Sequence, residues 1–181
     1  MSKYVIKKKV IIVGSYAVGK TSILNSFIHR QFEMDYKSTL GVNILAKEYE
    51  LNEDITVGFT FWDIGGQKLF RNIYPRFFGL SNAAMIVYDV TRMDSFDEIP
   101  SWYSSIQKYI QEKIPIVLVG NKIDLVDQRT VPTRVAEDLA NQYGFFYIET
   151  SAKTGKNIDA AFKELATILA KIALSNEINS N

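Results

Sequence analysis

Eight residues near the start of the chain have the spacing of a loop that binds phosphate groups. Residues 14–21 read Gly-Ser-Tyr-Ala-Val-Gly-Lys-Thr, which fits the pattern G-x-x-x-x-G-K-[ST]. An apolar run, residues 10–13, precedes the loop, and a segment with helical character, residues 22–28, follows it. In this setting, glycines let backbone N–H groups surround a phosphate at the positive end of a helix dipole. A glycine-rich turn that fits by chance is the alternative for this loop taken alone.

The end of this loop supplies side chains that can act on a nucleotide. The Lys20 ammonium could reach the β- and γ-phosphates, and the Thr21 hydroxyl could bind Mg²⁺. We therefore expect nucleotide contacts from the loop and the first residues of the helix, which are Ser15, Tyr16, Ala17, Val18, Gly19, Lys20, Thr21 and Ser22.

A second motif, Asp-Ile-Gly-Gly-Gln, begins where another apolar segment ends. Asp63 closes that segment, the place where a nucleotide-binding fold puts the carboxylate that holds Mg²⁺, usually through water. The Gly66 N–H can approach a γ-phosphate closely. The Gln67 amide can both donate to and accept from an attacking water. We expect Gln67, Lys20 and Gly66 to be the catalytic groups.

Two further motifs indicate which base the site would accept. Residues 121–124 read Asn-Lys-Ile-Asp, and residues 150–153 read Thr-Ser-Ala-Lys. The Asp124 carboxylate can accept hydrogen bonds from N1–H and the 2-amino group of guanine, whereas adenine would leave it unpaired. A site of this kind can reject the wrong base by about 10⁴-fold. We expect Asn121 to tie the loop to neighbouring backbone, the Lys122 stem to lie over the sugar and base, and the Ala152 N–H to contact guanine O6. The predicted base-binding set is Asn121, Lys122, Asp124, Leu125, Ser151, Ala152 and Lys153.

The apolar segments between the motifs predict the fold. Residues 42–51 and 55–63 read as a hairpin, and residues 83–88, 115–120 and 145–149 read as further strands. Helices are expected over 101–112, over 133–143 with Thr133 as cap and Gly144 as stop, and from Asn157 onward. The prediction is a three-layer α/β fold of the phosphate-binding-loop type. It has a six-stranded, mostly parallel sheet, one antiparallel hairpin pair at the edge and about five helices. Residues 1–174 would form one domain, with a short polar tail, expected to fray, at 175–181.

Composition narrows the functional classes. The chain has 181 residues, a formal net charge of +1, one histidine and no cysteine. The charge gives no reason to expect nucleic-acid binding, and the composition excludes disulfides, thiolate chemistry and cysteine-based metal sites. The only histidine, His29, is expected at the surface. The lysines at 7–9 are expected in solvent at the start of a strand rather than in contact with anionic lipid. With no membrane-length apolar run and no secretory signal, we expect an intracellular protein of the cytoplasm. We also expect a monomer.

In this order, the motifs resemble those of the Ras-like small GTPases over essentially the whole chain. The motifs are most similar to those of the Rab branch in sequence and spacing. The Rab-like sequences are Ser-Thr-Leu-Gly-Val at 38–42, Tyr-Asp-Val-Thr at 88–91, Ser-Phe at 95–96 and Val-Gly-Asn-Lys-Ile-Asp-Leu at 119–125. The resemblance implies a switch that binds GTP or GDP with Mg²⁺ and hydrolyses GTP.

The resemblance also assigns residues between the motifs. It implies that Thr39 binds Mg²⁺ and the γ-phosphate in the GTP state, so that Thr21, Thr39 and Asp63 form the metal set. It implies that Phe32 packs on the guanine and that Tyr36 closes over the phosphates. The segments around Thr39 and over residues 64–78 correspond to two switches that would bind effectors, exchange factors and GTPase-activating proteins.

Several positions depart from the Rab pattern. Tyr16 stands where a small residue is usual, beside the expected position of the attacking water. The sequence Ile-Gly-Gly-Gln at 64–67 is similar to that of the Arf branch. Lys68 stands where Rab proteins usually carry Glu. The chain has no cysteine for prenylation and Ser2 in place of a myristoylated glycine, which leaves membrane association open.

Two other functions are left open by these departures. A module that holds nucleotide permanently, with little or no hydrolysis, is favoured by Tyr16 and opposed by Gln67 and Thr39. A phosphate-loop kinase of small substrates is opposed by the guanine-type motif at 121–124 and by the lack of an evident arginine-rich lid. No arginine of this chain is evidently placed to take part in GTP hydrolysis, so we expect a partner protein to supply one.

Overall fold

A computed structural model describes residues 4–29, 41–66 and 75–178. Along the chain the elements are β1 (Tyr4–Val13), α1 (Lys20–His29), β2 (Val42–Glu50), β3 (Ile55–Ile64), α2 (Pro75–Phe78), β4 (Ala83–Asp89), α3 (Met93–Asp97), α4 (Ile99–Tyr109), β5 (Ile116–Asn121), the 3₁₀ turn η2 (Val126–Gln128), α5 (Thr133–Tyr143), β6 (Phe146–Glu149) and α6 (Ile158–Ile178).

The six strands form one sheet in the order β2-β3-β1-β4-β5-β6. Strands β2 and β3 pair antiparallel, and every other pair is parallel. A tight turn joins β2 to β3, where the Asn52 side chain accepts hydrogen bonds from the amides of Asp54 and Ile55. The parallel pairs need longer crossovers, and helices provide them. The predicted α/β class, the six strands and the antiparallel edge pair are confirmed.

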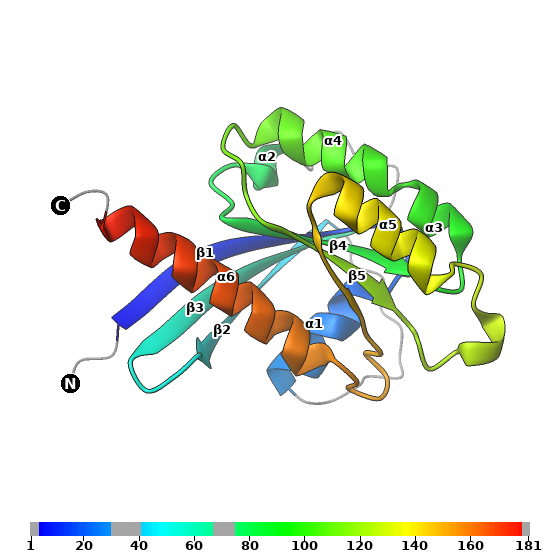
Figure 1. Cartoon of the computed structure of the whole chain (residues 1–181), viewed down its shortest axis with the longest axis horizontal. Helices are drawn as coiled ribbons and strands as arrows, with labels where there is room; N and C mark the ends of the chain where they lie inside the picture. The colour runs from blue at the N-terminus through cyan, green and yellow to red at the C-terminus, as the bar shows by residue number, and fades with distance from the viewer. Residues whose placement is uncertain (1–3, 30–40, 67–74, 179–181) are drawn as a thin grey trace.

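Helices cover both faces of the sheet and give three layers (Figure 1). On one face, α1 and α6 pack against a core that contains Phe27, Phe61 and Phe162. On the other face, α3, α4 and α5 pack against a core that contains Phe96 and Trp102. The central strand β4 is buried at every position, as expected for a parallel strand covered on both sides. In the described ranges, none of the helices is long and apolar enough to cross a membrane.

The strand register brings the motifs to one edge of the sheet. Ile12 pairs with Asp63 across β1 and β3, and Asp89 pairs with Asn121 across β4 and β5. Gly120 pairs with Glu149 across β5 and β6. The carboxyl ends of β1, β3, β4, β5 and β6 therefore meet where ligands bind in open α/β sheets.

Several strand ends differ from the predictions by one residue, and four further differences concern β1, α4, α5 and the end of the chain. β1 begins at Tyr4 rather than residue 10, because it pairs with β3 from Ile55 onward. The helix predicted over 101–112 runs instead over Ile99–Tyr109 and ends where Ile110 turns extended. Pro132 precedes α5 and Thr133 is its first residue rather than its cap, while Gly144 ends it with a positive φ of 71°, as predicted. The expected frayed end at 175–181 is helical as far as Ile178.

Candidate functional site

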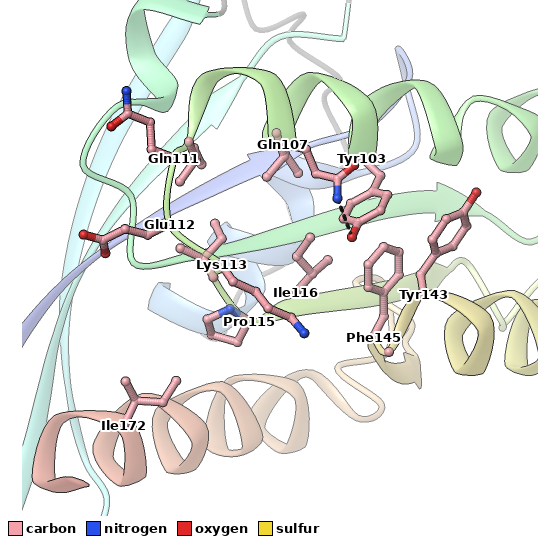
Figure 2. A pocket seen from close by; sticks show the side chains of 14 residues that line it. Tyr103, Gln107, Gln111, Glu112, Lys113, Pro115, Ile116, Tyr143, Phe145 and Ile172 are labelled. Carbon is pink, nitrogen blue, oxygen red and sulfur yellow. Dashed lines mark hydrogen bonds between the residues drawn. The ribbon is translucent and has the colours of Figure 1, made fainter. Parts of the chain in front are cut away.

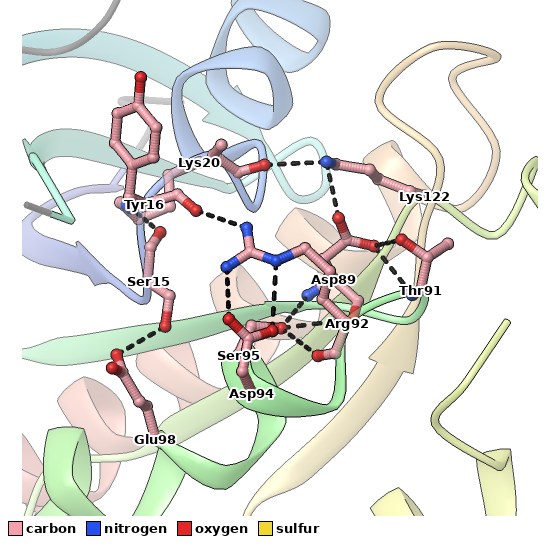
Figure 3. A network of polar contacts seen from close by, with 11 residues as sticks. Ser15, Tyr16, Lys20, Asp89, Thr91, Arg92, Asp94, Ser95, Glu98 and Lys122 are labelled. Atoms are coloured by element: carbon pink, nitrogen blue, oxygen red, sulfur yellow. Dashed lines mark hydrogen bonds and ion pairs between the residues drawn. The ribbon is translucent and has the colours of Figure 1, made fainter. Parts of the chain in front are cut away.

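Three consecutive carbonyl groups of the loop between β1 and α1 accept hydrogen bonds from side chains outside the loop. The Tyr16 carbonyl accepts from the Arg92 guanidinium at 2.8 Å, and the Ala17 carbonyl accepts from Lys122 Nζ at 2.8 Å (Figure 3). The Val18 carbonyl accepts from Asn121 Nδ2 at 3.0 Å. The loop backbone is thus held by groups that follow β4 and end β5.

These contacts determine which way the loop amides face. The described residues have no cis peptide bond, and in a trans peptide the carbonyl and the following N–H point in opposite directions. With the carbonyls of residues 16–18 turned to outside donors, the N–H groups of Ala17, Val18 and Gly19 face the opposite side of the loop. Such a run of inward amides, next to a helix N-terminus, forms an anion-binding concavity. The loop therefore fits a phosphate group.

Lys20 lies inside this loop. Its side chain is 6% exposed, and its Nζ donates to the carbonyls of Gly14 and Ser15 at 2.8 and 2.9 Å. Burial lowers the pKa of the Lys20 ammonium to about 8, while nearby Asp63 and Glu98 oppose the shift. A bound phosphate would supply the negative charge that favours the protonated amine.

Thr21 and Asp63 come together although they are far apart in the sequence. The Thr21 hydroxyl donates to Asp63 Oδ2, and the Asp63 side chain is fully buried at the end of β3. A hydroxyl and a carboxylate in contact are the hard oxygen ligands that Mg²⁺ prefers, with phosphate oxygens and water completing its shell. These two residues therefore fit a Mg²⁺ ion. Elsewhere in the described ranges, no group of three or more His, Cys, Asp or Glu side chains could hold a metal.

Glycine is required at two positions near the loop because other groups occupy the space that a side chain would need. Gly19 has a φ of +99°, and a side chain there would overlap the Asn121 amide. A side chain at Gly66 would overlap the backbone of Ser15 and Tyr16. The described end of the Asp-Ile-Gly-Gly segment therefore lies directly on the phosphate loop.

Asn121 joins the phosphate loop to the loop after β6. Its Nδ2 donates to Val18, while its Oδ1 accepts from the Thr150 hydroxyl at 3.2 Å and from the Ala152 amide at 3.1 Å. The predicted tie between Asn121 and neighbouring backbone is therefore present. The Ala152 amide, expected to contact guanine O6, donates to the Asn121 side chain in this structure.

The other base-motif residues are also held within the protein. The Ser151 hydroxyl donates to Asp124 Oδ1 at 2.6 Å, and this hydrogen bond restricts the orientation of the carboxylate. Lys122 has a φ of 71°, and its ammonium forms an ion pair with Asp89 at 2.7 Å besides its contact with the Ala17 carbonyl. Its head group therefore points to the phosphate loop rather than staying in solvent.

The remaining predicted residues have less specific placements. Ser22 is half-buried in the first turn of α1, the Leu125 amide bonds the Lys122 carbonyl, and Lys153 is exposed. His29 is exposed, as predicted. Several positions named in the sequence analysis fall outside the described residues, among them Ser2, Phe32, Tyr36, Thr39, Gln67 and Lys68.

Sequence reasoning missed the polar groups that hold the loop from the side of α3 and α4. Besides Arg92, the Glu98 carboxylate accepts from the Ser15 hydroxyl at 2.7 Å, and Asp89 orients Lys122 (Figure 3). No spacing rule relates Arg92 to Tyr16, because the two are 76 residues apart. Only the position of Asp89 at a predicted strand end was a signal that it would lie at the ligand edge.

A hollow lies between α4, α5 and α6, away from the carboxyl ends of the strands (Figure 2). It has a volume of about 630 Å³, and its lining includes Tyr103, Tyr143, Phe145 and Ile116. Ile116 begins β5 and Phe145 immediately precedes β6, so the hollow is at the amino ends of these strands. It is separate from the site formed by the motifs.

The model of the Ras family matches residues 9–171 of the chain. The chain belongs to the Ras family. Rab11A of Lotus japonicus is 38% identical over 164 residues, which are 91% of this chain and 72% of that protein. RABA4a of Arabidopsis thaliana is 37% identical over 164 residues, again 91% and 72% of the two chains. RABA4b of the same plant is 36% identical over 177 residues, or 96% and 79%.

These relatives are Ras-related proteins with Rab names, so the Ras-family chain is a Rab-like small GTPase, as its motifs predicted. The family binds guanine nucleotide, which agrees with a loop whose amides face inward.

Proposed function

We propose that this Ras-family chain is a Mg²⁺-dependent switch that binds GTP, hydrolyses it slowly and recruits effectors in the GTP state. The observation that carries the proposal is the arrangement of the phosphate loop. Its carbonyls at residues 16–18 bond Arg92, Lys122 and Asn121, which leaves the inward amides for phosphate oxygens.

The guanine preference rests on Asp124. Its carboxylate is held by Ser151 at 2.6 Å, and further lone pairs on the same group can accept from N1–H and the 2-amino group of guanine. Adenine lacks both donors, so its binding would bury a carboxylate without compensation. We propose Asn121, Lys122, Leu125, Ser151, Ala152 and Lys153 as the residues that complete the base site.

Hydrolysis joins a water oxygen to the γ-phosphorus and breaks its bond to the bridging oxygen, giving GDP and phosphate. We propose that Gln67 orients the water, while Lys20 and the Gly66 N–H stabilise negative charge on the phosphate oxygens. Thr21, Asp63 and, in the GTP state, Thr39 would hold Mg²⁺, which would supply positive charge beside the phosphates. Phe32 and Tyr36 would cover the base and the phosphates.

A nucleotide-holding module without hydrolysis is the alternative that one observation favours. Tyr16 is 44% exposed, and its backbone is fixed by Arg92 at the outer side of the loop. A ring held there would stand in the way of a group that approaches the γ-phosphate. Under this alternative the protein would remain in one state and act as a fixed docking surface.

Single-turnover hydrolysis of preloaded GTP in Mg²⁺ separates the two functions. A switch converts GTP to GDP over the course of the assay, and Gln67→Leu stops the conversion. Tyr16→Gly is expected to accelerate it if the ring obstructs the water. GTP that persists equally in wild type, Gln67→Leu and Tyr16→Gly would favour the holding module.

We further propose that effectors, exchange factors and GTPase-activating proteins bind at the two switches, that one of them supplies an arginine to the reaction, and that the process served is membrane traffic. The chain would act as a monomer in the cytoplasm or peripherally on the cytosolic face of a membrane. Residues 1–174 would form the GTP-binding domain, with 175–181 as a short tail.

A further inference from the structure

We propose that Arg92 is a positioning residue for nucleotide binding, because it holds the peptide between Tyr16 and Ala17 in the orientation that presents the Ala17 N–H to phosphate. This inference rests on the proposed function, since it concerns the same loop. Arg92 lies outside the nucleotide motifs, immediately before α3, and reaches the loop across the surface of the domain (Figure 3).

The first observation is the direction of the contact. Arg92 NH1 donates to the Tyr16 carbonyl at 2.8 Å, from the side of the loop opposite to the inward amides. Because the peptide is trans, fixing this carbonyl also fixes the Ala17 N–H. Lys122 and Asn121 fix the two following peptides in the same way. Arg92 therefore supplies the first of three equivalent contacts, and its two companions belong to the base-binding motif.

The second observation is that this peptide needs to be held. Ala17 has a φ of 62°, a left-handed conformation that is unfavourable for a residue with a Cβ and accessible to glycine. The loop between β1 and α1 thus contains a strained residue directly after the carbonyl that Arg92 bonds. Without Arg92, rotation of this peptide would relieve Ala17 and turn its N–H away from the phosphate.

The third observation is that Arg92 is itself oriented. Its Nε and NH2 donate to the two carboxylate oxygens of Asp94 at 3.3 and 2.9 Å, which leaves NH1 for Tyr16. The same segment contacts the loop a second time, because Glu98 accepts from the Ser15 hydroxyl at 2.7 Å. Asp94 is 72% exposed, so its removal should disturb little beyond the orientation of Arg92.

The test measures the dissociation of fluorescent GDP and of a fluorescent, non-hydrolysable GTP analogue into excess unlabelled nucleotide, in Mg²⁺. Arg92→Met keeps the length of the side chain without its donors, and it should accelerate dissociation about tenfold, the usual scale for a lost charge-assisted hydrogen bond at a partly exposed site. Arg92→Lys, with one cation in reach, should recover part of that loss. Arg134→Met, the same substitution at an exposed position of α5, is the matched control and should remain within about twofold of wild type.

Repeating Arg92→Met in the variant Ala17→Gly distinguishes a positioning role of Arg92 from a general disturbance of α3. Gly adopts a positive φ without penalty, so in Ala17→Gly the peptide needs less support. In the Ala17→Gly variant, the further change Arg92→Met should accelerate nucleotide dissociation by about threefold or less. Thermal unfolding of the nucleotide-bound variants checks that each is folded.

The possible results have distinct meanings. A wild-type dissociation rate for Arg92→Met would overturn the positioning role, and so would an equal factor in both backgrounds or an equally large effect of Arg134→Met. Failure of the unchanged protein to retain guanine nucleotide in preference to ATP would instead overturn the proposed function. Retention by wild type, with a large effect of Arg92→Met that shrinks in Ala17→Gly, supports both.

Discussion

The phosphate loop and the base-binding loops are built in opposite ways. In the phosphate loop the backbone amides would bind the ligand, and the loop carbonyls are held by long side chains from elsewhere, among them Arg92 and Lys122. In the base-binding loops, short side chains of the loops themselves make the contacts. Ser151 holds Asp124, and Asn121 receives hydrogen bonds from Thr150 and Ala152.

This difference follows from what each region would recognise. A phosphate presents the same oxygens in every nucleotide, so backbone amides and nearby positive charge suffice. A base is distinguished by the pattern of donors and acceptors on its edge, which requires a specific side chain. Changes to Asp124, which would contact the base edge, should therefore alter preference between nucleotides, and changes to the groups that hold the phosphate loop should alter affinity for all of them.

The largest effect is expected from Asp124→Asn. The amide cannot accept from both guanine donors, so the preference for GTP over xanthosine triphosphate should fall by about 10⁴-fold. Competition against fluorescent GDP measures the two affinities. The control is Asp127→Asn, an exposed carboxylate close by in sequence, which should change neither. An unchanged ratio in Asp124→Asn would remove Asp124 from base recognition.

An intermediate effect is expected from Asn121→Ala, which breaks the link between the two regions. The variant leaves the Val18 carbonyl and the Ala152 amide without their buried partner. Loss of buried hydrogen bonds of this kind costs about 1–3 kcal/mol each, so nucleotide should dissociate about 100-fold faster.

The ratio of nucleotides sharpens this second prediction. Because Asp124 remains, the preference for GTP over xanthosine triphosphate should survive in Asn121→Ala. Asn141→Ala, at an exposed position of α5, is the matched control. If Asn121→Ala lost its base preference as well, phosphate binding and base recognition would not be separable.

The parts of the molecule predicted from sequence are those determined by local patterns. The apolar runs at residues 10–13 and 83–88 indicated buried parallel strands, and the Asn-Glu-Asp turn indicated the hairpin. Strand ends carry the motifs because parallel strands end at one edge, so the sequence alone was enough to place Asp63 and Asn121 near residues 14–21. The observed pairings of Ile12 with Asp63 and of Asp89 with Asn121 confirm that placement.

The contacts that sequence could not predict depend on side-chain direction over long sequence separations. The Lys122 ammonium points to the Ala17 carbonyl, 105 residues away, because its backbone has a positive φ and Asp89 lies beside it. Thr133 looked like a helix cap, but Pro132 already supplies an extended residue there, and the Thr133 hydroxyl donates to Glu149 on β6. Patterns of three or four residues contain no information on such partners.

The smallest effect is expected from Glu149→Gln, behind the base-binding loops. Arg129 donates to both carboxylate oxygens of Glu149 at 2.7 and 2.9 Å, and the Tyr147 hydroxyl donates at 2.8 Å. Burial acts to raise the pKa of Glu149, but the hydrogen bonds from Arg129 and Tyr147 outweigh it and lower the pKa. A carboxyl whose pKa is lowered by folding stabilises the protein above its unfolded pKa, and this contribution is lost as the pH falls through its folded pKa.

Glu149→Gln should therefore reduce the free energy of unfolding by about 1 kcal/mol at pH 7, since the ion pair is partly open to solvent. The difference from wild type should shrink as the pH is lowered below about 4, near the ordinary glutamate pKa. Urea unfolding of the GDP-bound proteins at several pH values measures it, with the exposed Glu137→Gln as control. Because Glu149 only supports the loop that begins at Thr150, base preference should not change. A changed preference would mean that the ion pair also sets the position of Ser151 and Asp124.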